Sequence, residues 1–330
     1  MSCRCLTALL LAAALTISGC GGASEDAAPN RAAMLLLDFQ PNAVHTGIYT
    51  AVARGYDDAL GLNLRIRAPS DSTDAVKLLV SGRTDLAVLD IHDLAIARER
   101  GRDLVGVMAI VQEPLAAILA RPEIKTPRDL EGRRVGVTGL PSDDAILRSI
   151  VEGAGGDPGR VRTTTIGFDA VRSLLTGRVA AATGFWNAEG VALRAKRPEI
   201  REFRVNDYGA PAYPELVLTT TRELLQDQPG VVRAAVAAIA RGYSEVLSDP
   251  ENAVAALLAA VDGLDRASVA RELDAVSPAF TAGAQSFGQL DPARLRAWAR
   301  WEQRFGVVKR LPDVARAFDG RYVPRSGSRD

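Results

Sequence analysis

The sequence offers few side chains that could carry out covalent chemistry. It contains only two histidines, His45 and His92, and its three cysteines all fall within the first twenty residues. Most acid–base and nucleophilic schemes need a histidine or a cysteine beside a second polar group, and no serine lies in a nucleophile-elbow pattern. No His, Cys and Glu residues have the spacing of metal ligands. The residue types therefore indicate binding rather than catalysis, without a metal or a cofactor.

Side chains suited to binding a flat, polar molecule stand at the ends of expected strands and the starts of expected helices. Aromatic faces stack on flat rings, and carboxylates accept hydrogen bonds from amino groups. Amide side chains both donate and accept. The candidate aromatic, carboxylate and amide residues are Phe39, Tyr49, Trp186, Tyr213, Asp38, Glu189, Asn42 and Asn187.

Each candidate also has a structural interpretation. Phe39 and Tyr49 are equally typical of a hydrophobic core. Asp38 lies at the end of an expected strand and fits an Asx-turn, while Glu189 lies in the first turn of an expected helix, where a carboxylate interacts favourably with the helix dipole. His45 begins an expected helix and is as typical of a hydrogen-bonded structural histidine as of a ligand contact. These residue types alone leave both interpretations open.

The N-terminus has the pattern of an exported lipoprotein. A short basic head precedes Leu6–Ile17, an apolar run of the length of a signal-peptide core and too short for a spanning helix. Ile17-Ser18-Gly19-Cys20 then resembles a lipobox, in which the cysteine is lipidated. We expect a signal peptide over 1–19 and a lipidated Cys20 with a flexible tether over 20–32, which anchors the protein on the extracytoplasmic face of the cell membrane.

Composition narrows the classes of partner. The sequence has 40 basic and 40 acidic residues and no basic stripe, so nucleic acid is not an expected partner. After the signal peptide no stretch is long and apolar enough to cross a membrane. Removal of residues 1–19 from the 330 leaves 311, which is enough for one large domain or two medium ones.

Short β-branched runs alternate with helical spacing over two stretches, which predicts mostly parallel α/β units. The expected strands are 34–39, 63–68, 85–89, 104–112, 134–138, 161–166 and 179–183. The expected helices are 45–60, 72–81, 90–100, 142–154, 168–175, 186–196, 228–247, 252–261, 267–276 and 292–305.

Each of these two stretches is too short for a full large domain, so they predict two α/β lobes with a ligand cleft between them. The apolar segments 115–120 and 215–220 bracket the second stretch and are expected to form the two crossings between lobes. Lobe 1 is then 33–117 and 217–322, lobe 2 is 118–216, and 323–330 is a polar tail. The C-terminal helices are expected on lobe 1, and ligand at the carboxyl ends of the strands.

The turn at 136–142 bears on the sign of the charge in the cleft. It lacks the glycine spacing of a dinucleotide site and the lysine of a P-loop. Ser142 is expected to cap the next helix, whose first turn carries Asp143 and Asp144 and would repel an anion. With Asp38 and Glu189 close by, an acidic cleft is expected, which favours a neutral or cationic amine heterocycle.

Several motifs carry a resemblance to a known family. Leu37-Asp38-Phe39-Gln40-Pro41-Asn42, followed by His45 and Gly47-Ile48-Tyr49, resembles the opening of the thiamine-pyrimidine precursor binding proteins (ThiY-like). Further matches are 69–71, 81–85, 136–139, 185–190 and Tyr208-Gly209 with Tyr213 and Glu215. The likeness runs from about Met34 to about Thr221. Phe39 stands where the family usually has Trp, and Asp90-Ile91-His92-Asp93 replaces a more usual Gln-Pro turn.

The resemblance implies a type II periplasmic-binding-protein-like fold and a role as the solute-binding component of an ABC importer. The implied ligand is formylaminopyrimidine or hydroxymethylpyrimidine, and the implied partners are a permease and its ATPase, with the binding protein a monomer. The residues expected to contact ligand are Asp38, Phe39, Asn42, His45, Tyr49, Ser70, Asp90, Trp186, Asn187, Glu189 and Tyr213.

Three alternatives remain open. Relatives of this family bind riboflavin, which needs a longer slot, or sulfonates, which need inward Arg and N–H donors. The superfamily also contains a pyrimidine synthase that consumes its own histidine with pyridoxal phosphate and carries a cysteine-rich iron motif. Here the processed chain keeps one cysteine, and Lys77 is the only lysine between residues 33 and 117, so the sequence favours a binder over an enzyme.

Overall fold

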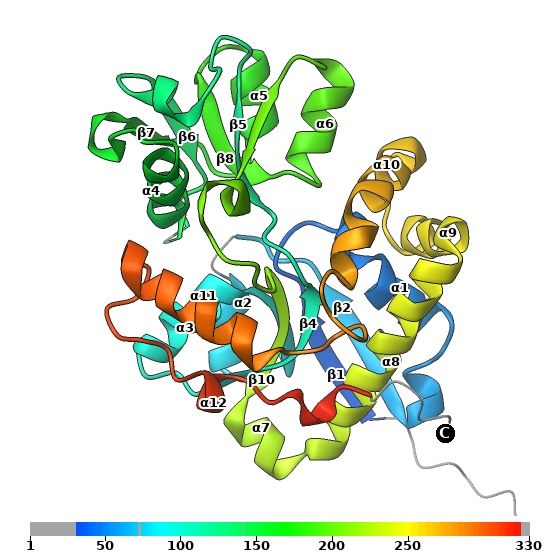
Figure 1. Cartoon of the computed structure of the whole chain (residues 1–330). Helices are drawn as coiled ribbons and strands as arrows, with labels where there is room; N and C mark the ends of the chain where they lie inside the picture. Colours follow the sequence, from blue (N-terminus) through cyan, green and yellow to red (C-terminus); the bar gives the residue numbers. More distant parts are fainter. Residues whose placement is uncertain (1–30, 72–73, 141, 325–330) are drawn as a thin grey trace, which may run out of the picture.

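The computed structural model describes residues 31–71, 74–140 and 142–324, which form two α/β lobes (Figure 1). The predicted signal peptide, the predicted lipidation site Cys20 and residues 325–330 lie outside the described residues. Each lobe is built on one five-stranded sheet. Within the described ranges no helix is long and apolar enough to cross a membrane. The predicted two-lobe α/β architecture is confirmed.

The sheet of lobe 1 has the strand order β2-β1-β3-β10-β4. Its strands are β1 (Arg31–Leu36), β2 (Leu62–Arg67), β3 (Leu86–Asp90), β4 (Leu104–Val111) and β10 (Leu216–Thr221). β1 pairs in parallel with β2 and β3, whereas β10 runs antiparallel to β3 and β4. β3 and β4 are buried along their whole length, as expected for strands covered on both faces.

The sheet of lobe 2 repeats this plan with the order β7-β6-β8-β5-β9. Its strands are β5 (Ala116–Ala120), β6 (Arg134–Val137), β7 (Arg162–Thr165), β8 (Ala181–Phe185) and β9 (Arg201–Arg204). β6 pairs in parallel with β7 and β8, and β5 is antiparallel to β8 and β9. In each lobe the antiparallel strand is therefore the one that has just arrived from the other lobe. The sequence reading missed β9.

The chain changes sheet between Val111 and Ala116 and again between Arg204 and Leu216. The segments 115–120 and 215–220, which were expected to be the crossings, are instead almost entirely the strands β5 and β10. Their apolar, β-prone composition reflects burial between two neighbouring strands in each sheet, and the crossings are the segments just before them. The lobe boundaries at 117 and 217 stay a prediction.

Helices cover the faces of both sheets. Lobe 1 carries α1 (Thr46–Ala53), α2 (Asp74–Val80) and α3 (Ile91–Glu99), and lobe 2 carries α4 (Asp143–Gly153), α5 (Ala170–Leu175) and α6 (Glu189–Lys196). The C-terminal part adds α7 (Arg222–Asp227), α8 (Pro229–Ser248), α9 (Pro250–Ala260), α10 (Arg266–Val276), α11 (Pro292–Phe305) and α12 (Val314–Ala317). Each predicted helix has a counterpart, but the predicted helix 45–60 ends at Ala53 as α1 and is followed by the 3-10 helix η2 (Asp58–Leu60). α7 and α12 were not predicted.

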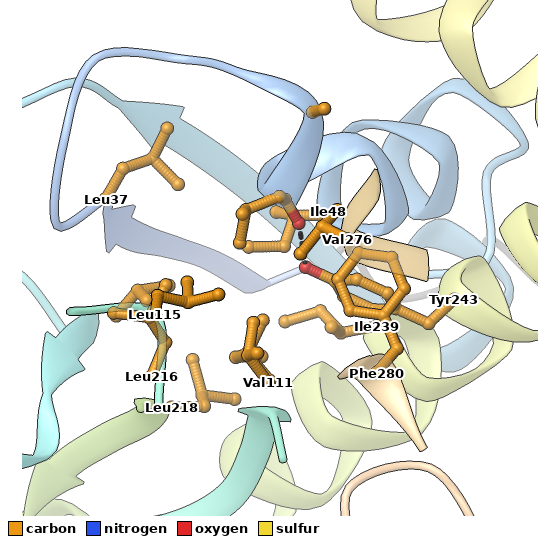
Figure 2. Close-up of a cluster of buried hydrophobic side chains, with 14 of the residues drawn as sticks. Leu37, Ile48, Val111, Leu115, Leu216, Leu218, Ile239, Tyr243, Val276 and Phe280 are labelled. Atoms are coloured by element: carbon orange, nitrogen blue, oxygen red, sulfur yellow. Dashed lines mark hydrogen bonds between the residues drawn. The ribbon is translucent and has the colours of Figure 1, made fainter. Parts of the chain in front are cut away.

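The core of lobe 1 joins its sheet to the C-terminal helices (Figure 2). The ring of Tyr243 on α8 packs over Gly47 on α1, and its hydroxyl donates to the carbonyl of Val44 at 2.6 Å. A Cβ on Gly47 would lie 2.4 Å from that ring, and one on Gly242 would lie 2.1 Å from the Gly47 carbonyl oxygen. The glycine of the opening motif is therefore required by the close packing of α1 on α8.

The C-terminal helices pack on lobe 1, as predicted, and two of them also reach lobe 2. α8 and α9 contact α1, while α10 contacts α6 and α11 contacts α4. The indole of Trp301 on α11 donates to the hydroxyl of Ser149 on α4 at 3.2 Å. These helices thus flank the space between the lobes on two sides.

Candidate ligand-binding site

A cavity lies between the lobes, at the carboxyl ends of the parallel strands of both sheets. From lobe 1 it is lined by residues that follow or end β1 and β3, and from lobe 2 by residues that follow or end β6, β7 and β8. Open α/β sheets bind ligands at this edge. The full lining is Asp38, Phe39, Ala75, Val88, Leu89, Asp90, Asp93, Ala116, Ala117, Thr138, Leu140, Ser142, Asp143, Ile146, Phe168, Thr183, Gly184, Phe185, Glu189 and Leu216.

Asp38 enters the cavity on a loop that the next residues hold in place. The side chain of Asn42 caps the short 3-10 helix η1 (Ala43–His45) by accepting from the Val44 N–H at 2.9 Å. The N–H of Asn42 donates to Nδ1 of His45 at 3.2 Å, so that Nε2 carries the proton and donates to Oδ1 of Asp38 at 2.9 Å. The fully buried His45 therefore orients Asp38, and neither His45 nor Asn42 lines the cavity.

Two phenylalanines meet across the cleft. The ring of Phe39 from lobe 1 and that of Phe168 from lobe 2 pack edge to face, with centroids 4.5 Å apart and planes at 80°. Phe185, at the end of β8, is a third ring on the cavity wall. Aromatic surfaces thus face the space from both lobes, which is the requirement for holding a flat ring.

Asp90 and Asp93 face the cavity from the start of α3. Asp90 caps this helix by accepting from the His92 N–H at 2.8 Å, and burial raises the pKa of its carboxyl. Asp93 lies one turn along, and the described residues form no hydrogen bond to its carboxyl. Burial and the neighbouring Asp90 raise the pKa of Asp93 to about 7. A negative charge on Asp90 therefore disfavours a negative charge on Asp93.

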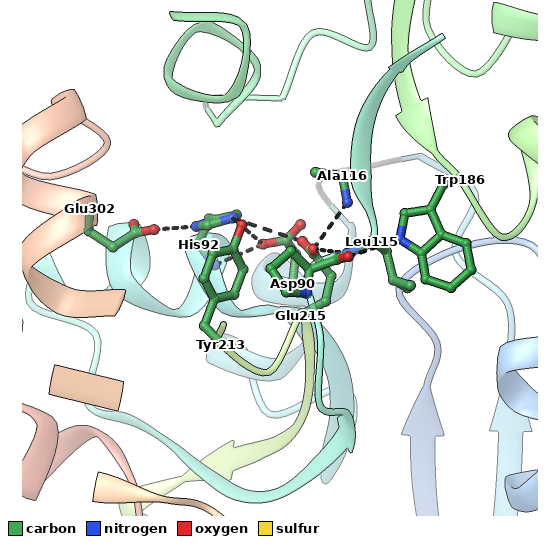
Figure 3. A network of polar contacts seen from close by, with 9 residues as sticks. Asp90, His92, Leu115, Ala116, Trp186, Tyr213, Glu215 and Glu302 are labelled. Carbon is green, nitrogen blue, oxygen red and sulfur yellow. Dashed lines mark hydrogen bonds and ion pairs between the residues drawn. The ribbon is translucent and has the colours of Figure 1, made fainter. Parts of the chain in front are cut away.

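Behind Asp90 lies a buried polar network that ties the two crossings together (Figure 3). Oε2 of Glu215 accepts from the N–H groups of Leu115 and Ala116, at 2.5 and 3.2 Å. Burial and the nearby Asp90 raise the pKa of Glu215 to about 8. Glu215 precedes β10, and its two donors precede or begin β5. One carboxyl therefore links the two crossings between the lobes.

His92 sits at the centre of this network. Its Nδ1 pairs with Glu302 on α11, and its Nε2 lies 3.2 Å from the hydroxyl of Tyr213. Burial alone would lower the pKa of His92, but the carboxylates of Glu302, Asp90 and Glu215 outweigh burial and raise that pKa to about 10. His92 is therefore a buried cation at neutral pH that offsets the surrounding acids.

Among the described residues, Asp90, His92 and Glu215 bring one possible metal-ligand atom each within 4.8 Å of one another. Both ring nitrogens of His92 already have partners in Glu302 and Tyr213. A protonated imidazole cannot coordinate a metal. We therefore read this group as a charge network and assign no metal to it.

On the lobe 2 side, Asp143 is held by three neighbouring groups. Its carboxylate accepts from the hydroxyls of Thr138 and Thr183, each at 2.9 Å, and from the Gly139 N–H at 2.7 Å. Ser142 stands at the N-cap of α4 as predicted, but its side chain makes no capping bond. The Asp143 carboxylate instead bonds the preceding turn and the middle of β8, and so fixes this wall of the cavity.

Glu189 lines the cavity from the first turn of α6. Its Oε2 accepts from the Phe185 N–H at 3.1 Å. Burial raises the pKa of Glu189, since only backbone N–H groups, and no cation, oppose that effect. Asp38, Phe39, Asp90 and Glu189 are the four predicted site residues that face the cavity.

The other predicted site residues support its surroundings. Tyr49 belongs to the core, where burial raises the pKa of its hydroxyl, and Ser70 bonds Asp74 at the start of α2. Tyr213 contacts His92, and Asn187 is buried with its Oδ1 unpaired. None of these four lines the cavity, and their contact with ligand stays a prediction.

Trp186 also lies away from the cavity and instead contacts the crossing between the lobes. Its N–H and its indole Nε1–H donate to the carbonyls of Leu115 and Pro114, at 3.0 and 2.9 Å. The guanidinium of Arg204 lies 4.0 Å from its ring centroid. Trp186 thus holds the first crossing between the lobes in place. Its contact with ligand likewise stays a prediction.

Sequence reasoning missed Asp93, Phe168 and Phe185 as lining residues, and it placed Asp143 at the cleft without naming it as a ligand contact. Alternation along β8 carries a signal for Phe185, because Thr183 and Phe185 point to the same face and Trp186 does not. Helical spacing carries one for Asp93, since Asp90 and Asp93 are three residues apart and share a face. Phe168 lies in a loop, where neither period applies.

The comparisons with known proteins agree with this geometry. The model of the NMT1/THI5-like family matches residues 42–253, which is more than half of the chain. The chain belongs to this family. A formylaminopyrimidine-binding protein of Halalkalibacterium halodurans is 35% identical over 254 residues, covering 76% of this chain and 77% of that protein.

A relative with another activity is more distant. The 4-amino-5-hydroxymethyl-2-methylpyrimidine phosphate synthase of Legionella pneumophila is 23% identical, covering 88% of this chain and 92% of that protein. Family membership alone therefore leaves both binding proteins and synthases as precedents.

Solved structures show the fold. The periplasmic aliphatic sulphonate binding protein SsuA from Escherichia coli matches with a TM-score of 0.70 at 17% identity, covering 88% of this chain and 92% of that one. The periplasmic nitrate-binding protein NrtA from Synechocystis matches with a TM-score of 0.68 at 11% identity, covering 88% and 86%. At these identities the likeness is one of fold, and the predicted periplasmic-binding-protein-like fold is confirmed.

Proposed function

We propose that this protein is the extracytoplasmic solute-binding component of an ABC importer for a thiamine-pyrimidine precursor, either formylaminopyrimidine or hydroxymethylpyrimidine. The observation that carries the proposal is the cavity between the lobes, which offers aromatic faces and a buried carboxyl, Glu189. Only backbone N–H groups, and no cation, offset the burial of that carboxyl. The 35% identity to a formylaminopyrimidine-binding protein supports the ligand class.

In this proposal the pyrimidine ring lies among Phe39, Phe168 and Phe185, and Glu189 accepts the hydrogens of its amino group. Asp38, oriented by His45, contributes from the opposite lobe. A hydrogen bond to a charged group contributes about 1.5–3 kcal/mol, and an aromatic contact adds about 0.5–1.5 kcal/mol beyond burial. A few such contacts account for selective capture of a small ring.

The proposal also makes this chain a binder rather than an enzyme. The two histidines, His45 and His92, are both buried and both engaged by carboxylates, at Asp38 and Glu302. Neither lines the cavity, so neither is placed to exchange a proton with a bound molecule. The permease and its ATPase would take the ligand from the monomeric binding protein.

Membrane attachment through Cys20 belongs to the same proposal. Dual acylation gives stable attachment, whereas one weak signal does not. Cys20→Ser should abolish lipid labelling and move the protein to the soluble fraction. Retention of lipid and membrane fractionation by that variant would show that the Ile17-Ser18-Gly19-Cys20 reading is wrong.

Calorimetric titration with both pyrimidines tests the ligand. Glu189→Gln should weaken binding by roughly 10- to 150-fold, because an amide replaces a charged acceptor. Its melting temperature should change little, since the remaining carbonyl still accepts from the Phe185 N–H. Glu223→Gln, an exposed first-turn glutamate on α7, is the matched control and should leave affinity unchanged.

Other outcomes would replace the proposal. Binding of riboflavin or of an alkanesulfonate, with neither pyrimidine bound, would reassign the ligand. Loss of melting temperature in Glu189→Gln with affinity intact would make Glu189 structural. Production of a pyrimidine by the purified protein, with loss of one histidine from its peptide map, would make it a synthase.

A further inference from the structure

The cavity has an excess of acid that a neutral aminopyrimidine does not require. Five carboxyl groups line it, and within the described residues no Lys, Arg or His does. One carboxylate suffices to accept the hydrogens of an amino group. The lining residues with carboxyl groups are Asp38, Asp90, Asp93, Asp143 and Glu189.

Partners within the protein account for some of these groups. Asp143 is satisfied by Thr138, Thr183 and Gly139, and Asp38 is paired with His45. Both therefore have structural reasons to be acidic. Asp93, at the start of α3, has no such partner among the described residues.

Of the pair Asp90 and Asp93, Asp93 is the acid without a hydrogen-bond partner among the described residues. Asp90 accepts from the His92 N–H, is hydrogen-bonded to the Glu215 carboxyl, and its Oδ1 lies 4.0 Å from Nε2 of His92. The described residues donate no hydrogen bond to the Asp93 carboxyl. Both lie on the cavity wall, one helical turn apart. A buried carboxylate without a nearby counter-charge is costly, and the protein responds by holding protons on such groups.

The titration behaviour agrees with this geometry. Burial and Asp90 raise the pKa of Asp93 to about 7, and burial raises the pKa of Asp90. The charged groups that face this pair are His92 on α3, Arg100 directly after α3, Glu302 on α11, Asp38 after β1 and Glu215 before β10. Of these, the nearest cation, His92, is already shared with Glu302.

We propose that the natural ligand carries a positive charge, as a protonated primary amine on the pyrimidine that is seated against Asp90 and Asp93. This inference rests on the proposed function: it keeps the thiamine-pyrimidine precursor as the ligand class and replaces the two neutral candidates by a charged one. The amine left when the formyl group is removed from formylaminopyrimidine has this chemistry. Glu189 would hold the ring amino group from lobe 2, while the two aspartates of lobe 1 hold the ammonium.

The sign of the pH dependence separates this proposal from its rival. If a neutral ligand placed a carbonyl against protonated Asp93, binding would strengthen as the pH falls below 7. An ammonium needs Asp93 ionised, so its affinity should instead fall, by up to about tenfold per pH unit below that pKa. A primary amine stays protonated throughout this range.

The test compares three pyrimidines that differ only in one substituent: the primary amine, the formylated amine and the hydroxymethyl compound. Each is titrated into the full processed protein by calorimetry between pH 5.5 and 7.5. Wild type should bind the amine at least about 10-fold more tightly than either neutral compound at pH 7.5. Its affinity for the amine should fall with pH, and that for the neutral compounds should not.

Asp93→Asn should remove this preference and flatten the pH dependence. Asp144→Asn, an exposed aspartate on α4 outside the cavity lining, is the control and should bind as wild type does. If Asp93→Asn melts early, Asp90→Asn and the wild-type pH profile still decide the question.

The outcomes are distinguishable from those of the proposed function. Equal or tighter binding of a neutral pyrimidine, or binding that strengthens towards pH 5.5, overturns the charged-ligand inference and leaves the proposed function standing. Binding of none of the three pyrimidines overturns both.

Discussion

The two walls of the cavity use carboxyl groups in opposite ways. On lobe 2, Asp143 is bonded to two threonine hydroxyls and one backbone N–H, so its charge has a local reason. On lobe 1, Asp90 is bonded to the His92 N–H and the Glu215 carboxyl, but the described residues donate no hydrogen bond to Asp93, and burial raises the pKa of both aspartates. One wall is satisfied by its own fold, and the other is not.

This difference teaches how to separate structural from functional acids. A carboxylate whose acceptor positions are filled holds the wall in shape, and its removal leaves buried donors unpaired. A carboxyl that is buried, crowded and poorly bonded lowers the stability of the free protein and is a candidate for ligand binding. The two kinds should respond in opposite directions to the same Asp→Asn substitution.

The largest expected effect is on the lobe 2 wall. Asp143→Asn places an amide donor among three donor groups, and it should lower the free energy of unfolding by about 3 kcal/mol. Asp93→Asn should change it by less than about 0.5 kcal/mol at pH 7.5, or raise it, because an uncompensated charge is removed. Urea unfolding of both variants beside Asp144→Asn measures this. Equal destabilisation by the two variants would remove the distinction between the walls.

A moderate effect should appear in the pH dependence of stability. The folded-state pKa of His92 is raised to about 10 and that of Glu215 to about 8, so the folded protein binds more protons than the unfolded chain. This contribution is complete below the unfolded pKa of each group and is lost as pH rises through the folded one. The melting temperature should therefore fall between pH 6.5 and 9.5.

Glu215→Gln isolates the part of the fall in melting temperature with pH that is due to Glu215. The amide is neutral at every pH, so the decline below pH 8 should become shallower while the part due to His92 persists. Glu251→Gln, exposed on α9, should reproduce the wild-type profile. A wild-type melting temperature that rises from pH 6.5 to 9.5 would contradict the charge network assigned to His92 and Glu215.

The smallest expected effect is in overall shape. If the satisfied wall of lobe 2 and the unsatisfied wall of lobe 1 close on a ligand, the radius of gyration should decrease slightly on binding. Small-angle scattering with and without saturating pyrimidine measures it. An unchanged radius at saturation would mean that the lobes do not move with the ligand.

The fold was largely accessible from the sequence, because strands and helices follow local periods. β3 and β4 are continuous apolar runs, and α8 and α11 have clear amphipathic spacing. β9, only four residues long with three of them charged, gives no such signal. Segments such as 115–120 were recognised as extended, but no period reveals whether an apolar strand crosses between lobes or lies inside one.

The site was accessible only in part. Asp38 and Asp90 were found because they end or follow parallel strands, whose carboxyl ends meet at the cleft. Phe185 lines the cavity and Trp186 does not, because neighbouring residues at a strand end face opposite sides, and ligand contact by Trp186 stays a prediction. The division between Asp143 and Asp93 could not be predicted, because it depends on donors from Thr183, which is 40 residues away in the chain.

The central claim, that the cavity between the lobes binds a thiamine-pyrimidine precursor, is tested most directly by competition. Ligand-free protein is mixed with equal concentrations of formylaminopyrimidine, its deformylated amine, hydroxymethylpyrimidine, riboflavin and an alkanesulfonate, passed through gel filtration, and the retained small molecule is identified by mass spectrometry. We predict that one pyrimidine is retained at about one molecule per protein chain, and that Glu189→Gln retains much less of it. Retention of riboflavin or the sulfonate in place of any pyrimidine would contradict the account.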